Sequence, residues 1–323
     1  MLTWLLMTGW LAWKRPNGYT PDGARVSNQY SDGGWHYHSN ALGALLPEVD
    51  QFMMGFKLVP TVDPYFTRQQ GETLSNLTRD IYAELEADSD FQALGSVMPS
   101  AYRELRGQTF DDGHYFLNRS PKLDHSKPLP ALVFLHGSGG NFKAYLWLMS
   151  RMADDLGMVV IAPSNGMGNW DEKHGPSAII RALDDVGNKI QLDASNIHLV
   201  GLSNGGLGVC RTAASIHGRR FASLTFISPA FDQKAVNSSS FATFWVGKPV
   251  LVITGHDDDR VPFSHVEESA IMMKTAGARV DMIPIKGADH FMLFSHRGAV
   301  IGKMTDWLSA RIGGGKPNQT GPK

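Results

Sequence analysis

The chain has 323 residues, of which 42% are hydrophobic and 19% are charged, and its formal net charge is −1 at pH 7. This composition is sufficient for a large apolar core and excludes a disordered or low-complexity protein. The near balance of 30 basic and 31 acidic residues, with no recurring basic block, excludes nucleic acid as an expected partner. The single cysteine, Cys210, excludes an intrachain disulfide and a cysteine-rich metal site.

Residues 1–13 form an almost wholly apolar segment that is followed by Lys14 and Arg15. A helix of this length spans roughly 20 Å, which is shorter than the ~30 Å hydrocarbon core of a bilayer. A secretory signal would carry its positive charges before the apolar run rather than after it. A buried helix, an atypical signal and part of a membrane anchor all remain open, and with them a cytoplasmic, a membrane-associated or an exported location.

Residues 14–60 are rich in Gly, Tyr, Trp, Asn and Asp and show no sustained period, which is typical of irregular surface structure. Apolar spacing within 71–94 predicts a helix. We expect residues 14–107 to form an N-terminal extension, and the sequence leaves open whether it is a domain, a lid or an oligomer contact. The glycine-rich residues 313–323 are expected to form a disordered tail.

From residue 108 onward, short apolar runs alternate with segments of helical length. The expected strands cover 115–117, 130–135, 158–162, 197–200, 223–227, 249–253 and 280–285. The expected helices cover 142–155, 176–190, 204–216, 265–276 and 298–311. This alternation predicts one α/β domain over 108–312, with a mostly parallel sheet and helices on both of its faces.

The residues that directly follow the strands are the candidates for a site, because ligands of such a sheet lie beyond the carboxyl ends of its strands. Gly201-Leu-Ser203-Asn-Gly205 follows one strand and precedes a helix, which is the context that a nucleophile elbow requires. Ser203 is therefore the candidate nucleophile, and the alternative is a tight turn with an idle serine. His290, in a short loop after the last strand, is the candidate general base.

Residues 136–140 (HGSGG) form a glycine-rich loop after strand 130–135. Such a loop frees backbone N–H groups for a developing oxyanion, and we expect the N–H of Ser138 to act together with that of Asn204. Gly137 and Gly139 are expected to line the substrate site, and His136 is expected to brace the loop. A phosphate-binding loop is excluded, because no G-K-[ST] follows.

The candidate acid is one of three consecutive aspartates, residues 257–259, that follow strand 249–253. A carboxylate at this place can orient and balance an imidazolium. The alternatives are a solvated turn or a calcium loop, although the run lacks the alternating spacing of such a loop. His36 and His38 lack the matching carboxylate or cysteine spacing of a metal site, so no metal is expected.

A serine, an acid and a histidine, each placed after a later strand, resemble the α/β-hydrolase superfamily over about residues 110–312. In that superfamily the acid lies three residues after a glycine and three before a Val-Pro pair, which matches Gly255, Val261 and Pro262 and so selects Asp258. The stretches PLPALVFLHGSGGN, NIHLVGLSNGG and KGADHF most resemble the poly(3-hydroxybutyrate) depolymerase and feruloyl esterase-like branch. Residues 1–107 have no recognised counterpart in it.

The resemblance implies a carboxylic-ester hydrolase that forms an acyl-enzyme on Ser203, without a metal or cofactor, and acts on small or polymeric esters. A serine peptidase of the same fold and a non-catalytic binding protein remain alternatives, and the oligomeric state stays open. The superfamily usually inserts its cap between the sixth and seventh core strands, and the interval 228–248 is too short here for a multi-helix lid. We therefore expect a minimal cap, in which Trp245 lines the substrate pocket or, alternatively, covers the sheet edge.

Overall fold

The computed structural model of the chain describes residues 23–31, 46–61, 63–64, 66–98, 101–102, 113–124, 126–168, 170 and 175–312. The apolar segment 1–13, the pair His36 and His38, and the expected disordered tail 313–323 lie outside these residues.

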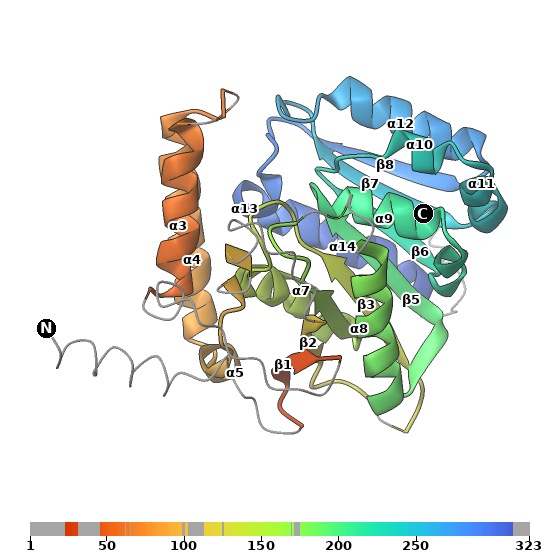
Figure 1. The fold of residues 1–323 in the computed structure, drawn as a ribbon, viewed down its shortest axis with the longest axis horizontal. Helices are drawn as coiled ribbons and strands as arrows, with labels where there is room; N and C mark the ends of the chain where they lie inside the picture. The colour runs from red at the N-terminus through yellow and green to blue at the C-terminus, as the bar shows by residue number, and fades with distance from the viewer. Residues whose placement is uncertain are drawn as a thin grey trace, which may run out of the picture.

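An eight-stranded sheet runs through the molecule in the order β1-β2-β4-β3-β5-β6-β7-β8 (Figure 1). The strands are β1 (Val26–Tyr30), β2 (His114–Arg119), β3 (Leu129–Leu135), β4 (Val159–Pro163), β5 (Leu192–Leu202), β6 (Ser223–Ile227), β7 (Pro249–Gly255) and β8 (Arg279–Ile285). The pairs β1–β2 and β2–β4 are antiparallel, and the other neighbouring strands are parallel. The predicted mostly parallel sheet is therefore confirmed.

Helices cover both faces of this sheet, as predicted. The described helices are α3 (Glu48–Leu58), α4 (Arg68–Glu86), α5 (Ser89–Ala93), α7 (Lys143–Leu156), α8 (Gly175–Lys189), α9 (Gly205–Ala213), α10 (Gln233–Val236), α11 (Ser239–Trp245), α12 (Phe263–Thr275), α13 (Met292–Ser295) and α14 (Arg297–Ile312), with short 3₁₀ turns at Val59–Thr61 and Ile216–Arg220. The core on one face takes side chains from α3, α4, α7, α13 and α14. The core on the other face takes them from α8, α9, α10, α11 and α12.

Strand β3 shows why the central strands read as continuous apolar runs. Leu132 and Phe134 point into one core, and Val133 and Leu135 point into the other, because successive side chains of a strand alternate between its faces. All four side chains are fully buried. A strand covered on both faces needs apolar residues at every position, which is the pattern that the sequence shows.

The expectation of irregular structure over residues 14–60 is wrong in two places, at β1 and at α3. Strand β1 (VSNQY) contains three polar residues and joins the sheet at its edge, where it pairs antiparallel with β2. Helix α3 buries Glu48 and Gln51 together with apolar residues, so its buried face does not read as an apolar stripe. In both elements, tertiary contacts outweigh the local pattern.

The interval between β6 and β7 contains only the short helices α10 and α11, which confirms the expected minimal cap. Trp245, however, does not line a pocket. Its ring is fully buried, it stacks near Phe241, and its indole N–H donates to the carbonyl oxygen of Ala213 at 3.0 Å. Ala213 ends α9, about 13 Å of helix away from the elbow at its start. Trp245 therefore fills the core between α11 and α9, and its assignment to the substrate pocket is corrected.

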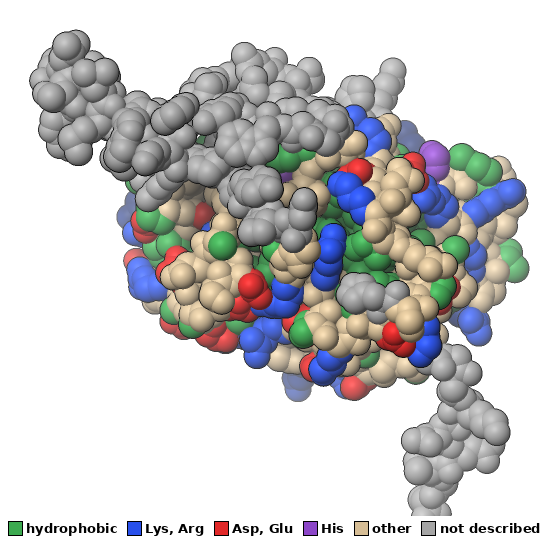
Figure 2. Space-filling model, turned by 90° about the horizontal axis from the view of Figure 1, so that it is seen from below, with side chains coloured by type: hydrophobic (Ala, Val, Ile, Leu, Met, Phe, Trp, Pro, Cys, Tyr) green, Lys and Arg blue, Asp and Glu red, His purple; other side chains and the backbone are tan. Residues whose placement is uncertain are grey.

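Charged side chains of both signs are mixed on the described part of one face of the molecule (Figure 2). On the face in Figure 2, Lys and Arg side chains lie among Asp and Glu side chains, without an extended patch of one sign on the described part of that face. A polyanion needs a continuous basic face, which this side of the described surface lacks.

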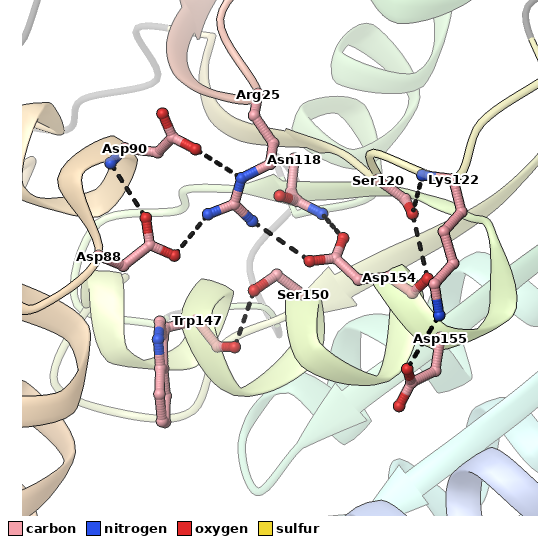
Figure 3. A network of polar contacts seen from close by, with 10 residues as sticks. All are labelled: Arg25, Asp88, Asp90, Asn118, Ser120, Lys122, Trp147, Ser150, Asp154 and Asp155. Atoms are coloured by element: carbon pink, nitrogen blue, oxygen red, sulfur yellow. Dashed lines mark hydrogen bonds and ion pairs between the residues drawn. The ribbon is translucent and has the colours of Figure 1, made fainter.

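The Arg25 guanidinium fastens the edge of the sheet to two helices (Figure 3). Its three nitrogens contact Asp88 at 2.5 Å, Asp90 at 2.6 Å and Asp154 at 3.2 Å. Asp88 and Asp90 lie at the start of α5, and Asp154 lies in α7. The Arg25 side chain is only 21% exposed, so this cluster is partly screened from water. The single cation therefore balances three carboxylates that would otherwise repel one another.

We expect Arg25→Met to lower the free energy of unfolding by about 2 kcal/mol, because it leaves three partly buried carboxylates without their common partner. Urea denaturation measures this loss. Lys122→Met is the matched control, since Lys122 pairs with Asp155 and these side chains are 60% and 72% exposed. The control should cost no more than about 0.5 kcal/mol. Equal losses in the two variants would contradict a special role for Arg25.

Candidate active site

Ser203 lies in a strained turn between β5 and α9. Its φ of 50° places it in the left-handed region, which a non-glycine residue rarely adopts. The turn is held by the Ser203 N–H, which donates to Ile227 O at 2.9 Å, and by the Ala230 N–H, which donates to Ser203 O at 2.9 Å. A Cβ at Gly205 would lie 2.4 Å from Leu135 O, so glycine is required there. This backbone is the one that a nucleophile elbow requires.

A chain of two hydrogen bonds joins Ser203, His290 and Asp258. The Ser203 hydroxyl lies 2.8 Å from Nε2 of His290, and Nδ1 of His290 lies 2.8 Å from Oδ2 of Asp258. The His290 side chain is 9% exposed and that of Asp258 is 0% exposed. Because a carboxylate only accepts, Nδ1 carries the hydrogen and Nε2 is free to accept the serine proton.

Asp258 differs from its neighbours in where its carboxylate points. Its second oxygen, Oδ1, accepts the backbone N–H groups of Arg260 at 2.9 Å and Val261 at 2.8 Å, so both oxygens are fixed. The Asp257 side chain is 60% exposed and contacts His256 instead. Asp259 is also exposed. Among the three aspartates, only Asp258 contacts His290.

The glycine-rich loop lies directly beside the serine. A Cβ at Gly137 would lie 3.4 Å from the Cβ of Ser203. The Gly139 N–H donates to Met167 O at 2.7 Å, so it is not free to bind a ligand. The N–H groups of Ser138 and Asn204 have no acceptor among the described residues. Asn204 directly follows Ser203, and Ser138 directly follows Gly137 beside it, so these two groups remain the candidate donors to an oxyanion.

The buried side chain of His136 holds this loop through hydrogen bonds. Its Nδ1–H donates to Gly137 O at 2.8 Å, and its Nε2 accepts the backbone N–H of Asn165 at 3.2 Å. The indole N–H of Trp170 donates to His136 O at 2.8 Å. Burial lowers the pKa of His136 to about 4, so the ring stays neutral at pH 7 and holds the loop as a donor and an acceptor.

The segment that connects α3 and α4 contacts both loops that carry Asp258 and His290. Arg260, two residues after Asp258, forms an ion pair with Asp63. The ring of Phe66 packs edge-on against that of Phe291, with 5.0 Å between the ring centroids. Sequence reasoning missed these residues. Arg260 and Phe291 stood beside the candidate acid and base, whereas no sequence signal relates Asp63 or Phe66 to them across some two hundred positions.

No group of three His, Cys, Asp or Glu side chains that could hold a metal ion is present among the described residues. Within the same part of the chain, no helix combines the length and the apolar character that crossing a bilayer requires. The apolar segment 1–13 lies outside that part.

A comparison with family models gives one match, which covers the C-terminal part of the α/β region. The model, described as the prolyl oligopeptidase family, matches residues 233–315, which include Asp258 and His290. The matched stretch is about a quarter of the chain. A comparison with curated proteins gives no match.

Solved structures are similar over somewhat less than two thirds of the chain. Esterase 2 of Thermogutta terrifontis, phosphonylated by sarin, is 16% identical over 65% of this chain and 95% of its own, with a TM-score of 0.51. A Bacteroides ovatus protein described as a dipeptidyl aminopeptidase IV is 13% identical over 61% of this chain and 33% of its own, with a TM-score of 0.51. Est1E of Butyrivibrio proteoclasticus with bound ferulic acid is 18% identical over 61% and 94%, with a TM-score of 0.47.

With the first two of these structures, which have TM-scores of 0.51, the likeness extends to the fold. The chain has the fold of the α/β-hydrolase superfamily.

Proposed function

We propose that this protein is a serine hydrolase that cleaves carboxylic esters through an acyl-enzyme on Ser203. One observation carries the proposal. A serine in a strained elbow lies 2.8 Å from a histidine nitrogen whose other nitrogen lies 2.8 Å from a buried carboxylate. That arrangement of nucleophile, base and orienting acid is the one that acyl transfer requires.

In the first step, Nε2 of His290 takes the Ser203 proton while Oγ attacks the ester carbonyl carbon. Asp258 holds the Nδ1–H and stabilises the imidazolium that forms. The carbonyl oxygen becomes an oxyanion and accepts the N–H groups of Ser138 and Asn204. The imidazolium then gives its proton to the leaving alkoxide, which departs as the alcohol and leaves an ester on Ser203.

In the second step, His290 removes a proton from water, and the resulting hydroxide attacks the acyl-enzyme carbonyl. The same two N–H groups hold the second oxyanion. Collapse of this intermediate releases the carboxylic acid and returns the proton to Ser203. Helix α9 begins at Gly205, beside the Asn204 N–H, and the partial positive charge of its N-terminus further favours the oxyanion.

Labelling with a fluorophosphonate, followed by an ester panel, tests this proposal. We expect the wild type to be labelled once, at Ser203, and to hydrolyse an activated ester, and we expect Ser203→Ala to do neither. Labelling at another residue would contradict the assignment of the nucleophile. A wild type that is neither labelled nor active would favour a non-catalytic binding protein.

A serine peptidase is the second candidate, because the matched family model is that of prolyl oligopeptidases. The matched residues include Asp258 and His290, which an esterase and a peptidase of this fold would use alike. Peptide anilides separate the two functions, since an amide is much harder to cleave than an activated ester. Turnover of a proline anilide at a kcat/KM near that of the best ester would favour the peptidase.

The short β6–β7 interval leads to an expectation about the acyl chain. With only two short helices in this interval and no large cap, we expect only a short acyl chain to be buried in the bound state. We expect p-nitrophenyl butyrate to be cleaved at least about tenfold better, in kcat/KM, than the palmitate ester. Initial rates below the solubility limit of each ester measure this ratio. A rate that rises with chain length, and increases sharply above the solubility limit, would contradict it.

A further inference from the structure

Residues 140–143, at the end of the glycine-rich loop and directly after it, are held mainly by residues between positions 46 and 98. The space next to Gly140 is filled by Met98, whose Sδ would lie 2.8 Å from a Cβ at Gly140. The ring of Phe142 stacks on that of Phe52, with 3.9 Å between centroids and 4° between planes. The Lys143 ammonium donates to Leu94 O at 3.0 Å. Three of these four positions therefore depend on residues 46–98, which we call the N-terminal segment.

Glu48 of this segment caps the helix that begins at the end of the loop. One oxygen of its carboxylate, Oε1, accepts the backbone N–H of Lys143 at 2.7 Å, and Lys143 is the first residue of α7. The preceding residue, Phe142, offers no side-chain acceptor to α7. A carboxylate at a helix N-terminus satisfies a free N–H and interacts favourably with the helix dipole. Glu48 thus replaces a local cap with one from a distant helix.

The Glu48 carboxylate is itself held in place. The residue is 6% exposed, and its Oε1 also accepts the hydroxyl of Tyr82 from α4. Burial, followed by the neighbouring Glu48 carboxylate, raises the pKa of Tyr82 well above its ordinary value, so this phenol keeps its proton and donates. Glu48 therefore connects α3, α4 and α7 at one buried point.

The N-terminal segment also contacts the other two parts of the site, through Asp63 with Arg260 and Phe66 with Phe291. It thereby contacts the glycine-rich loop, the acid loop and the histidine loop. The distance between an oxyanion donor and Ser203 decides how strongly the donor acts, and small displacements cost rate.

We propose that Glu48 is a positioning residue, which sets the oxyanion-binding loop against Ser203 by fixing the start of α7. This inference rests on the proposed hydrolase function. Glu48 does not touch the reacting atoms. Its loss should therefore reduce the stabilisation of the transition state and leave ground-state binding of the substrate nearly unchanged.

Glu48→Gln tests the proposal, because glutamine keeps the shape and an acceptor oxygen but removes the charge. Glu48 Oε2 has no hydrogen-bond partner among the described residues, so the amide nitrogen replaces an unpaired atom. We expect kcat on p-nitrophenyl butyrate to fall about tenfold while KM stays within about twofold. The affinity for an alkylboronic acid, whose adduct with Ser203 places an oxygen in the oxyanion site, should fall by about the same factor as kcat/KM.

Glu84→Gln is the matched control, because Glu84 lies on α4 and pairs with Arg297 of α14, away from the three loops. We expect its kcat to stay within about twofold of the wild type. Active-site titration with paraoxon counts functional sites and thermal unfolding shows that each variant is folded, so a smaller folded fraction is not mistaken for a lower kcat.

A folded Glu48→Gln variant with unchanged kcat would overturn the inference, and so would equal losses in the two variants. If Glu48→Gln does not fold, Tyr82→Phe provides a second test, because it removes only the hydroxyl that donates to Glu48. We expect it to lower kcat about threefold at constant KM, and an unchanged kcat would again overturn the inference. A folded wild type without labelling or turnover would instead overturn the proposed function, and this positioning role with it.

Discussion

Replacing Ser203 with alanine is expected to lower kcat on an activated ester by about 10⁴ or more, with the fold preserved. His290→Ala and Asp258→Asn should each cause losses of a similar order. The three residues act as one unit through two hydrogen bonds of 2.8 Å, so combined replacements should cost little more than single ones. Steady-state kinetics on p-nitrophenyl butyrate, together with thermal unfolding, measure both parts of this expectation.

The neighbouring aspartates provide the controls. Asp257→Asn and Asp259→Asn should cost less than about tenfold, because these side chains are exposed and do not contact His290. A larger loss in either control than in Asp258→Asn would move the acid role to that residue. If His290→Ala kept near wild-type turnover, His290 would not be the general base.

Acidification from pH 7 to 4 should destabilise the protein by up to about 6 kcal/mol through two buried histidines. Burial lowers the pKa of both His136 and His198 to about 4, whereas an unfolded chain has a histidine pKa near 6.5. Between these values the unfolded chain binds a proton and the folded chain does not. Stability is therefore complete above about pH 6.5 and is lost as the pH falls toward 4, by about 3 kcal/mol for each histidine.

Urea denaturation at several pH values measures this loss. His198 is 1% exposed, and its Nδ1 contacts Ser223 Oγ at 2.7 Å on the neighbouring strand β6. His198→Gln removes one of the two titrating groups, and we expect it to reduce the loss between pH 7 and 4 by about half. A free energy of unfolding that stays constant over this range in the wild type would contradict the expectation.

The C-terminal two thirds of the fold was predictable because local and tertiary preferences agree there. Central strands such as β3 need apolar residues at every position, and the elbow needs glycine where a Cβ would collide with backbone. These demands leave marks in the sequence within a few residues of the feature. The order of serine, acid and histidine along the chain then follows from the order of the strands.

The helix expected within 71–94 is present as α4, whereas helix α3 was not predictable, because its partners lie far away in the sequence. Glu48 and Gln51 are polar residues on the buried face of α3, and they are buried because a helix end and Tyr102 bind them. The prediction that Trp245 lines the substrate pocket was wrong for a different reason. An aromatic residue at the end of a short helix between two strands suits a pocket wall and a core equally well, and the burial of its ring and its hydrogen bond to Ala213 O decide between them.

The long-range contacts of the N-terminal segment have a consequence for folding. Glu84 and Arg297 are 213 positions apart, and Gln70 and Asp289 are 219 apart. During synthesis, the rings of Phe52, Phe56 and Phe66 emerge well before α13 and the Phe291 loop that cover them. Contacts of such separation close slowly and leave apolar surface exposed in the meantime. The N-terminal segment is thus synthesised early, but its contacts with the C-terminal part form late. We therefore expect refolding to be slow and to yield more native protein at low protein concentration.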